Sequence, residues 1–341
     1  MIEARAMDPD TEPEAFARGL LEAHGLPSRP LEATGGWSNR VWLAPGHVVR
    51  LSQGRFRDAF AHEARVLRLL PPDVPHAGVV AHGAVGRREW LVLERVPGRP
   101  LGDVWKALSE GRRQSAIAQL GELLRALHNV RLPTGFDNPW LHDAFAPGGD
   151  LRDAYHAPPH LYRRLIDAAW RVPGVDRAML EQVDAFIGSR LGAFGDEPTA
   201  LVHSDVHFAN LLWDGDRIGA LLDFEGSRPA APDLELDTLL RFCREPEHYP
   251  MIPGETSSLT AHDLASVTQW LSGAYPALFA HPRLSERLAV YEALWHLTQL
   301  LHFPPGSGPP DPWGHLLRSV EGGHQPVQQA AAQDQRFFAA E

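Results

Sequence analysis

The sequence predicts an α+β fold in two parts: a small, mostly antiparallel β-sheet with one main helix, followed by a larger helical region. Three observations lead to this prediction. Strand-like and helical runs follow one another as β-β-β-α-β-β in the N-terminal part. After the turn signal Pro97-Gly98, long segments have the apolar spacing of amphipathic helices. Two strand-like runs interrupt those helices near residues 200–224. We expect residues 1–97 to form one lobe and residues 98–341 the other.

Turn signals separate the elements of the N-terminal part. Residues 13–24 have Phe16, Leu20 and Leu21 at helical spacing and predict a leading helix. A second helix is expected over residues 56–70. Strands bounded by glycine- and proline-containing turns are expected at Leu31–Thr34, Arg40–Leu43, His47–Leu51, Gly78–Val85 and Glu89–Val96.

Helical periodicity dominates the C-terminal part. The helices are expected at Leu101–Leu108, Arg113–Val130, His160–Val172, Arg177–Phe194, Leu234–Cys243, Ala261–Leu278 and Leu284–His302. Residues 132–150 contain prolines and adjacent glycines and predict a loop-rich insert. Residues 200–204 and 219–224 are expected to be short strands, and residues 304–313 to break the helices.

Composition narrows the classes of protein. The formal net charge of −11 over 341 residues argues against a nucleic-acid-binding surface, and a cationic substrate is compatible with it. No apolar run approaches the ~20 residues that span a bilayer, and the acidic N-terminus lacks a secretory signal, so no membrane partner is expected. Cys243 is the only cysteine, which excludes an internal disulfide and favours a cytoplasmic location. Lys106 is the only lysine.

The segment Leu201–Ser227 contains the residues that predict the chemistry. Asp205 follows His203 by two residues, Asn210 follows Asp205 by five, and a strand-like run ends at Asp223. A carboxylate such as Asp205 can take the proton of an acceptor hydroxyl, while amide and carboxylate oxygens, as in Asn210 and Asp223, suit Mg²⁺. Phosphoryl transfer depends mainly on such positioning and charge neutralisation. The spacing therefore predicts a kinase, in which His203 organises the loop by hydrogen bonding.

Two alternatives use the same residues. His203, Asp205 and His207 alternate and would face one side of an extended strand, where they could bind a transition metal in a hydrolase. That hypothesis leaves Asn210 and the strand before Asp223 unexplained. The segment could also be a polar turn with a solvated carboxylate.

A family resemblance rests on these motifs. HSDVHFANLLW followed by LLDFEGS resembles the catalytic and metal-binding motifs of the aminoglycoside phosphotransferase / choline kinase superfamily, from about Leu31 to about His302. The resemblance implies a protein-kinase-like two-lobe fold, with Asp205 as the catalytic Asp and Asn210 and Asp223 as the Mg²⁺ ligands. Protein kinases match less well, since Glu225 replaces the glycine of D-F-G and no A-P-E follows. A small-molecule hydroxyl acceptor is therefore expected.

The same resemblance assigns a nucleotide site in the N-terminal part. The loop after Thr34 would cover the phosphates, with Gly35 and Gly36 permitting close backbone approach and Ser38 binding phosphate oxygens. An ordinary β-turn is the alternative for this loop.

The remaining nucleotide contacts would come from a strand, a helix and a hinge. Arg50 falls where such kinases have the lysine that holds the α/β-phosphates, with Glu63 as its ion-pair partner; a surface ion pair is the alternative. Glu94 and Val96 would read the adenine edge through their backbone groups.

Acidic residues after the metal motif are candidates for the acceptor pocket. Glu225, Asp233 and Asp237 would face a cationic acceptor. The resemblance leaves Asp233 and Asp237 as alternatives for the structural Asp that supports the catalytic loop in the family. A solvated helix face would show the same pattern.

The leading hypothesis is a Mg²⁺-dependent kinase that transfers the γ-phosphoryl of ATP or GTP to a hydroxyl of a small molecule. Acceptors served by this architecture include aminoglycoside-like antibiotics and cationic or sugar metabolites. The alternative is a catalytically silent pseudokinase that binds nucleotide, suggested by arginine in place of the strand lysine and by the short glycine loop.

Overall fold

The computed structural model describes residues 11–34, 39–54, 56–195, 199–249, 258–308 and 311–322. The chain divides into two compact units. Unit 1 comprises residues 1–140, 200–230 and 238–275, and unit 2 comprises residues 141–199, 231–237 and 276–341. A lobe boundary after residue 97 falls inside unit 1 and stays a prediction.

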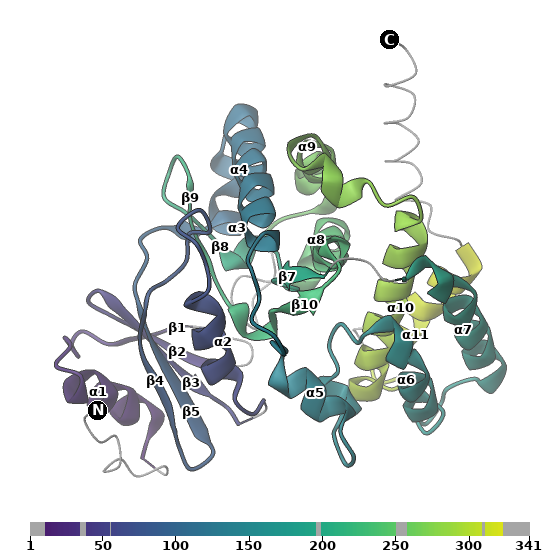
Figure 1. The fold of residues 1–341 in the computed structure, drawn as a ribbon, viewed down its shortest axis with the longest axis horizontal. Helices are drawn as coiled ribbons and strands as arrows, with labels where there is room; N and C mark the ends of the chain where they lie inside the picture. The colour runs from purple at the N-terminus through teal and green to yellow at the C-terminus, as the bar shows by residue number, and fades with distance from the viewer. Residues whose placement is uncertain are drawn as a thin grey trace. The chain divides into compact units, whose positions relative to one another are not determined.

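A five-stranded antiparallel sheet forms the N-terminal part of unit 1 (Figure 1), as expected from the sequence. Its strand order is β1-β2-β3-β5-β4. The strands are β1 (Glu32–Thr34), β2 (Asn39–Ala44), β3 (His47–Ser52), β4 (Val79–Val85) and β5 (Arg88–Glu94). The helices α1 (Pro13–Ala23) and α2 (Ala59–Leu67) lie on opposite sides of this sheet.

Alternation along β3 decides which side chains meet each helix. Val49 and Leu51 belong to the apolar cluster that includes Phe16 and Leu20 of α1. Because successive side chains of a strand point to opposite faces, Arg50 projects towards the other face, where α2 presents Glu63. The apolar residues of β3 thus place a charged side chain in a buried position.

The first turn of α2 is capped by a residue from β5. Asp58 has a left-handed backbone (φ 58°) and gives the helix no side-chain cap. Instead, the buried Glu89 carboxylate accepts hydrogen bonds from the backbone N–H of Asp58 at 2.6 Å and of Phe60 at 3.1 Å. A carboxylate at a helix N-terminus satisfies free N–H groups and favours the helix dipole. Glu89 thereby ties α2, and with it Glu63, to the sheet.

The rest of unit 1 surrounds the two short strands expected near residues 200–224. Strand β7 (Ala200–Val202) pairs with β10 (Arg228–Ala230), and β8 (Leu211–Trp213) pairs with β9 (Ile218–Leu221) and β6 (Arg99–Pro100). The helices of this part are α3 (Leu101–Val104), α4 (Glu110–His128) and α9 (Val267–Ala274), and α4 packs against α9 and β7.

Unit 2 is helical. Its elements are α6 (Tyr162–Ala169), α7 (Arg177–Arg190), α10 (Leu284–His302) and α11 (Pro312–Gly322), and α10 packs against the other three. One apolar cluster fills the unit, with Leu165 and Ile166 of α6, Leu180 of α7 and Leu294 of α10 among its residues. The helices α5 (Pro139–Phe145) and α8 (Glu235–Arg244) each span a boundary between the units.

Two predicted segments differ from the structure. The insert expected to be loop-rich contains α5, because proline is tolerated in the first turn of a helix. The single helix expected over residues 261–278 is instead a 3₁₀ turn at 261–264, α9, and a second 3₁₀ turn at 276–279. None of the helices in the described part of the chain is both long and apolar enough to cross a membrane.

Candidate active site

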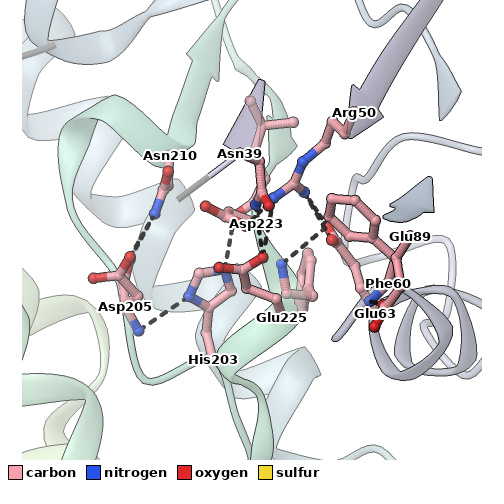
Figure 2. A network of polar contacts seen from close by, with 12 residues as sticks. Asn39, Arg50, Phe60, Glu63, Glu89, His203, Asp205, Asn210, Asp223 and Glu225 are labelled. Carbon is pink, nitrogen blue, oxygen red and sulfur yellow. Dashed lines mark hydrogen bonds and ion pairs between the residues drawn. The ribbon is translucent and has the colours of Figure 1, made fainter. Parts of the chain in front are cut away.

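One arginine and three carboxylates meet in unit 1 (Figure 2). Arg50 Nη1 donates to both carboxylate oxygens of Glu63 at 2.7 Å. Its Nη2 donates to Asp223 Oδ1 at 2.7 Å and to Glu225 Oε2 at 3.3 Å. The guanidinium therefore joins a strand, a helix and the segment after β9.

The cluster contains three acidic side chains and one basic side chain. Burial raises the pKa of Glu63 to about 7, although Arg50 opposes this shift. Burial, followed by the charge of Asp223, raises the pKa of Glu225 to about 8. Burial alone would lower the pKa of Arg50, but the three carboxylates outweigh it and raise that pKa above its usual value. One guanidinium faces three carboxylates, and bound protons or an added cation would relieve the repulsion among them.

Asp223 is presented by an unusual backbone. It lies two residues after the end of β9 and has a left-handed conformation (φ 67°, ψ 61°), which few residues other than glycine adopt. The Glu225 side chain, two residues later, accepts a hydrogen bond from Asn39 Nδ2 at 2.9 Å. Glu63, Asp223 and Glu225 offer oxygens within 4.8 Å of one another.

His203 connects the loop that contains Asp205 to the segment that contains Asp223. Its Nε2 lies 2.8 Å from the Leu222 carbonyl oxygen, and its Nδ1 accepts a hydrogen bond from the backbone N–H of Asp205 at 3.2 Å. The side chain is fully buried, and its ring packs edge to face against Phe224, with the two ring centroids 4.7 Å apart. Both ring nitrogens are engaged, so this geometry serves positioning rather than proton transfer.

Asp205 and Asn210 lie beside each other in the same loop (Figure 2). Asn210 Nδ2 donates to the backbone carbonyl of Asp205 at 2.9 Å and to its Oδ2 at 3.2 Å. His207 Nε2 lies 3.5 Å from the same carboxylate oxygen. The Asp205 side chain is 45% exposed, so its carboxylate is fixed on one side and accessible on the other.

The three residues of the hydrolase hypothesis do not form a metal site. The strand ends at Val202, and Ser204 has φ 68°, which breaks the alternation that would have aligned His203, Asp205 and His207. Among the described residues, the one cluster suited to a metal ion is that of Glu63, Asp223 and Glu225.

The other predicted nucleotide contacts are placed as follows. Gly35, Gly36 and Ser38 lie outside the described residues. Glu94 ends β5, and its backbone N–H donates to the Gly78 carbonyl at 2.8 Å. Val96 follows in a stretch without regular structure.

The three acidic candidates for the acceptor pocket fall in different units of the chain. Glu225 turns towards Arg50 and Asn39, as described above. Asp233 and Asp237 belong to unit 2, where Asp233 pairs with Arg287 and Asp237 lies 3.1 Å from His156 Nδ1. Within unit 1, Thr238 Oγ1 donates to the Ser204 carbonyl at 3.0 Å and so supports the loop that contains Asp205.

Comparison with protein families places these motifs in context. The model of the phosphotransferase enzyme family matches residues 31–249, which is well over half of the chain and includes every residue of the Arg50 cluster. The chain belongs to the phosphotransferase enzyme family. No sequence among curated proteins matches it significantly.

Solved structures confirm the kinase-like fold of this phosphotransferase. A thermostable mutant of aminoglycoside phosphotransferase APH(4)-Ia, in ternary complex with ADP and hygromycin B, superposes with a TM-score of 0.60 at 19% identity, over 90% of this chain and 99% of that one. ADP-bound APH(2'')-Ib gives 0.56 at 16% identity over 85% and 93%. The GDP complex of aminoglycoside 2'-phosphotransferase-IIIa gives 0.56 at 16% identity over 86% and 91%.

Sequence reasoning missed several residues that shape the site of this phosphotransferase. Asn39 begins β2 directly after the glycine loop, and Glu89 had been assigned only to a strand. Asn138 and Trp140 both donate to the Glu225 carbonyl oxygen at 2.9 Å from a segment expected to be a loop. A polar residue inside an apolar strand was the available signal for Glu89. The contacts from Asn138 and Trp140 have no local sequence signal.

Proposed function

We propose that this phosphotransferase transfers the γ-phosphoryl of ATP or GTP to a hydroxyl group of a small molecule in the presence of Mg²⁺. The observation that carries the proposal is the grouping, within unit 1, of an accessible Asp205 carboxylate, its partner Asn210, and Asp223 beside Arg50. These residues supply a base, hard oxygen ligands and a phosphate-binding cation.

The oxygen atoms near Asp223 fit a magnesium ion. Mg²⁺ prefers carboxylate and amide oxygens, and Asp223 and Asn210 offer both kinds. Asn210 Nδ2 is directed at Asp205, which leaves the side-chain oxygen for a cation. When bound, Mg²⁺ would neutralise the charge on the phosphate oxygens.

The chain's own groups would act on the acceptor and the nucleotide. Asp205 accepts the proton of the acceptor hydroxyl. The hydroxyl oxygen bonds to the γ-phosphorus as the bond between that phosphorus and the oxygen bridging it to the β-phosphorus breaks. Asn210 orients Asp205 for this step. The guanidinium of Arg50 exchanges contacts with Asp223 and Glu225 for the phosphate oxygens, and Glu63 holds it in place.

The acceptor would be an aminoglycoside-like antibiotic or a cationic or sugar metabolite. Solved relatives in complex with hygromycin B or streptomycin support the first class. Relatives with ADP, ATP or GDP support either nucleotide. The single cysteine, Cys243, still favours the cytoplasm as the place of action.

A phosphoryl-transfer screen with Asp205→Ala tests the proposal. Purified protein is incubated with Mg²⁺ and ATP or GTP and a panel of hydroxylated amines, aminoglycosides and sugars, and product phosphate is followed by ³¹P NMR. We expect transfer by the wild type and a loss of about 100-fold or more for Asp205→Ala. The matched control, Asp216→Ala, removes an exposed carboxylate in the β8–β9 turn and keeps wild-type activity.

Two results would contradict the proposal. Equal transfer by Asp205→Ala and the wild type would remove Asp205 from the reaction. Nucleotide binding without transfer to any acceptor or to water would favour the silent pseudokinase instead.

A further inference from the structure

Three consecutive backbone carbonyls follow Phe224, and each accepts a hydrogen bond from a distant side chain. Asn138 and Trp140 donate to the carbonyl of Glu225. Ser204 Oγ donates to the carbonyl of Gly226 at 3.0 Å, and His62 Nε2 lies 2.7 Å from the carbonyl oxygen of Ser227. Surface loops commonly leave such carbonyls to water. Here the segment is held by residues from three other parts of unit 1.

The Glu225 carbonyl oxygen accepts two hydrogen bonds of equal length. Asn138 Nδ2 and Trp140 Nε1 each lie 2.9 Å from this single oxygen, and a carbonyl oxygen has two lone pairs to receive them. Asn138 is fully buried and Trp140 is 7% exposed. Asn138 Nδ2 also lies 3.4 Å from the Ser227 carbonyl oxygen. Both donors come from a segment about 85 residues earlier in the chain.

The position of this carbonyl matters because functional side chains lie on either side of it. The Glu225 carboxylate contacts Arg50 and Asn39, and Asp223 lies two residues before it in a left-handed backbone. A non-glycine residue keeps that backbone only where its surroundings fix it. Fixing the next carbonyls therefore fixes the direction in which the Asp223 carboxylate points.

We infer that Asn138 and Trp140 are positioning residues: through the Glu225 carbonyl they hold the segment that contains Asp223. The inference rests on the proposed function, in which Asp223 binds Mg²⁺. Neither residue touches the reacting atoms in this account. Their two donors hold the backbone so that Asp223 faces the metal–nucleotide without rearrangement.

Asn138→Asp and Trp140→Phe test the inference. Asn138→Asp replaces the donor by an acceptor of equal size, and Trp140→Phe removes the indole N–H. Trp213→Phe is the matched control for Trp140, since Trp213 is equally buried and its indole N–H has no hydrogen-bond partner within the described residues. Asn129→Asp is the control for Asn138, because it removes an amide donor to the Arg125 carbonyl on the exposed end of α4.

Three measurements are made on the full chain. Hydrogen–deuterium exchange of residues 223–228 is followed without nucleotide, Mn²⁺ binding is titrated with AMP-PNP present, and kcat and KM are determined. We expect faster exchange in that segment, Mn²⁺ affinity and kcat lower by about 10- to 100-fold, and a smaller change in KM for the nucleotide. Both controls stay within about 2-fold of the wild type, as surface or bond-neutral changes do.

The outcomes separate the two proposals. Test variants whose exchange and Mn²⁺ affinity match those of the controls overturn this inference alone. Wild-type protein that binds no Mn²⁺ with AMP-PNP overturns the proposed function and this inference with it. Should Asn138→Asp fail to fold, Trp140→Phe decides the result by itself.

Discussion

Two buried arginines, Arg50 in unit 1 and Arg287 in unit 2, differ in the number of carboxylates that they contact. Arg287 donates through Nε and Nη2 to the two oxygens of Asp233, and through Nη1 to the Ala193 carbonyl at 2.9 Å. The Tyr291 hydroxyl donates to the same carboxylate at 3.1 Å. This group has one positive and one negative charge, whereas Arg50 faces three carboxylates.

We expect this difference to separate an ion pair that stabilises the fold from one that binds a ligand. A balanced, fully hydrogen-bonded pair needs nothing further and holds its unit together. The Arg50 cluster has three carboxyl groups for one guanidinium, and its Asp223 side chain is 32% exposed. We expect such a group to bind a cation. If Arg287 stabilises unit 2 and the Arg50 cluster binds a cation, we expect the following effects, in decreasing order of size.

Removing Arg287 is expected to cost the most stability. Arg287→Met leaves the Asp233 carboxylate buried without its cation, which lowers the free energy of unfolding by about 3–5 kcal/mol. Urea denaturation followed by circular dichroism measures this. The double variant Arg287→Met with Asp233→Leu recovers most of the loss, because neither charge remains. A loss below about 1 kcal/mol in the single variant would break the comparison.

The pH dependence of stability is expected to contain a contribution from His62. Its Nε2 contacts the Ser227 carbonyl, its Nδ1 accepts from Arg65 at 3.2 Å, and burial lowers its pKa to about 4. The unfolded chain, with a pKa near 6.5, takes up the proton first. The contribution is therefore complete above pH 6.5 and is lost as the pH falls towards 4, by about 3 kcal/mol at most.

His62→Gln tests this assignment. Glutamine can donate to the same carbonyl and accept from Arg65 without titrating, so the loss of stability between pH 7 and 4.5 becomes smaller. His248→Gln is the control, since Glu245 raises the pKa of His248 and its contribution is lost in the opposite direction, as the pH rises. Identical acid profiles for His62→Gln and the wild type would contradict the role of His62.

Divalent metal is expected to stabilise unit 1 through the unbalanced cluster. With nucleotide present, Mg²⁺ at about 100 times its Kd adds about 2.7 kcal/mol, seen as a rise in Tm that EDTA reverses. Asp223→Asn reduces this rise strongly, whereas Asp216→Asn leaves it unchanged. An equal rise in Tm in Asp223→Asn and the wild type would show that the metal does not bind at Asp223.

Much of the fold could be predicted because local patterns determine it. Strand-like runs bounded by turn signals predicted β3 and β5 to within a few residues, and apolar spacing did the same for α10. The break of the helix expected at 261–278 was missed, since apolar spacing continues across the 3₁₀ turns. The sequence did not predict α5, because prolines and glycines around Pro139 are typical of a loop. Proline is nevertheless favourable in the first turn of a helix, where Pro139 lies.

The candidate site divides in the same way. Asp205, Asn210 and Asp223 could be predicted as site residues from their spacing along the chain, and their roles stay predictions. The donors to the Glu225 carbonyl were not found, because Asn138 and Trp140 approach it through tertiary structure alone. A backbone carbonyl also leaves no mark in a sequence, so its partners can be identified only in three dimensions.

The arginine on β3 has a practical consequence for chemical labelling. Reagents that tag nucleotide sites by acylating a lysine amine need an uncharged nitrogen nucleophile close to the phosphates. Arg50 remains a cation at every accessible pH. The one amine-bearing side chain, Lys106, is paired with Asp263 and half exposed to solvent. A proteome-wide survey based on such reagents would overlook this enzyme even when it is abundant and active.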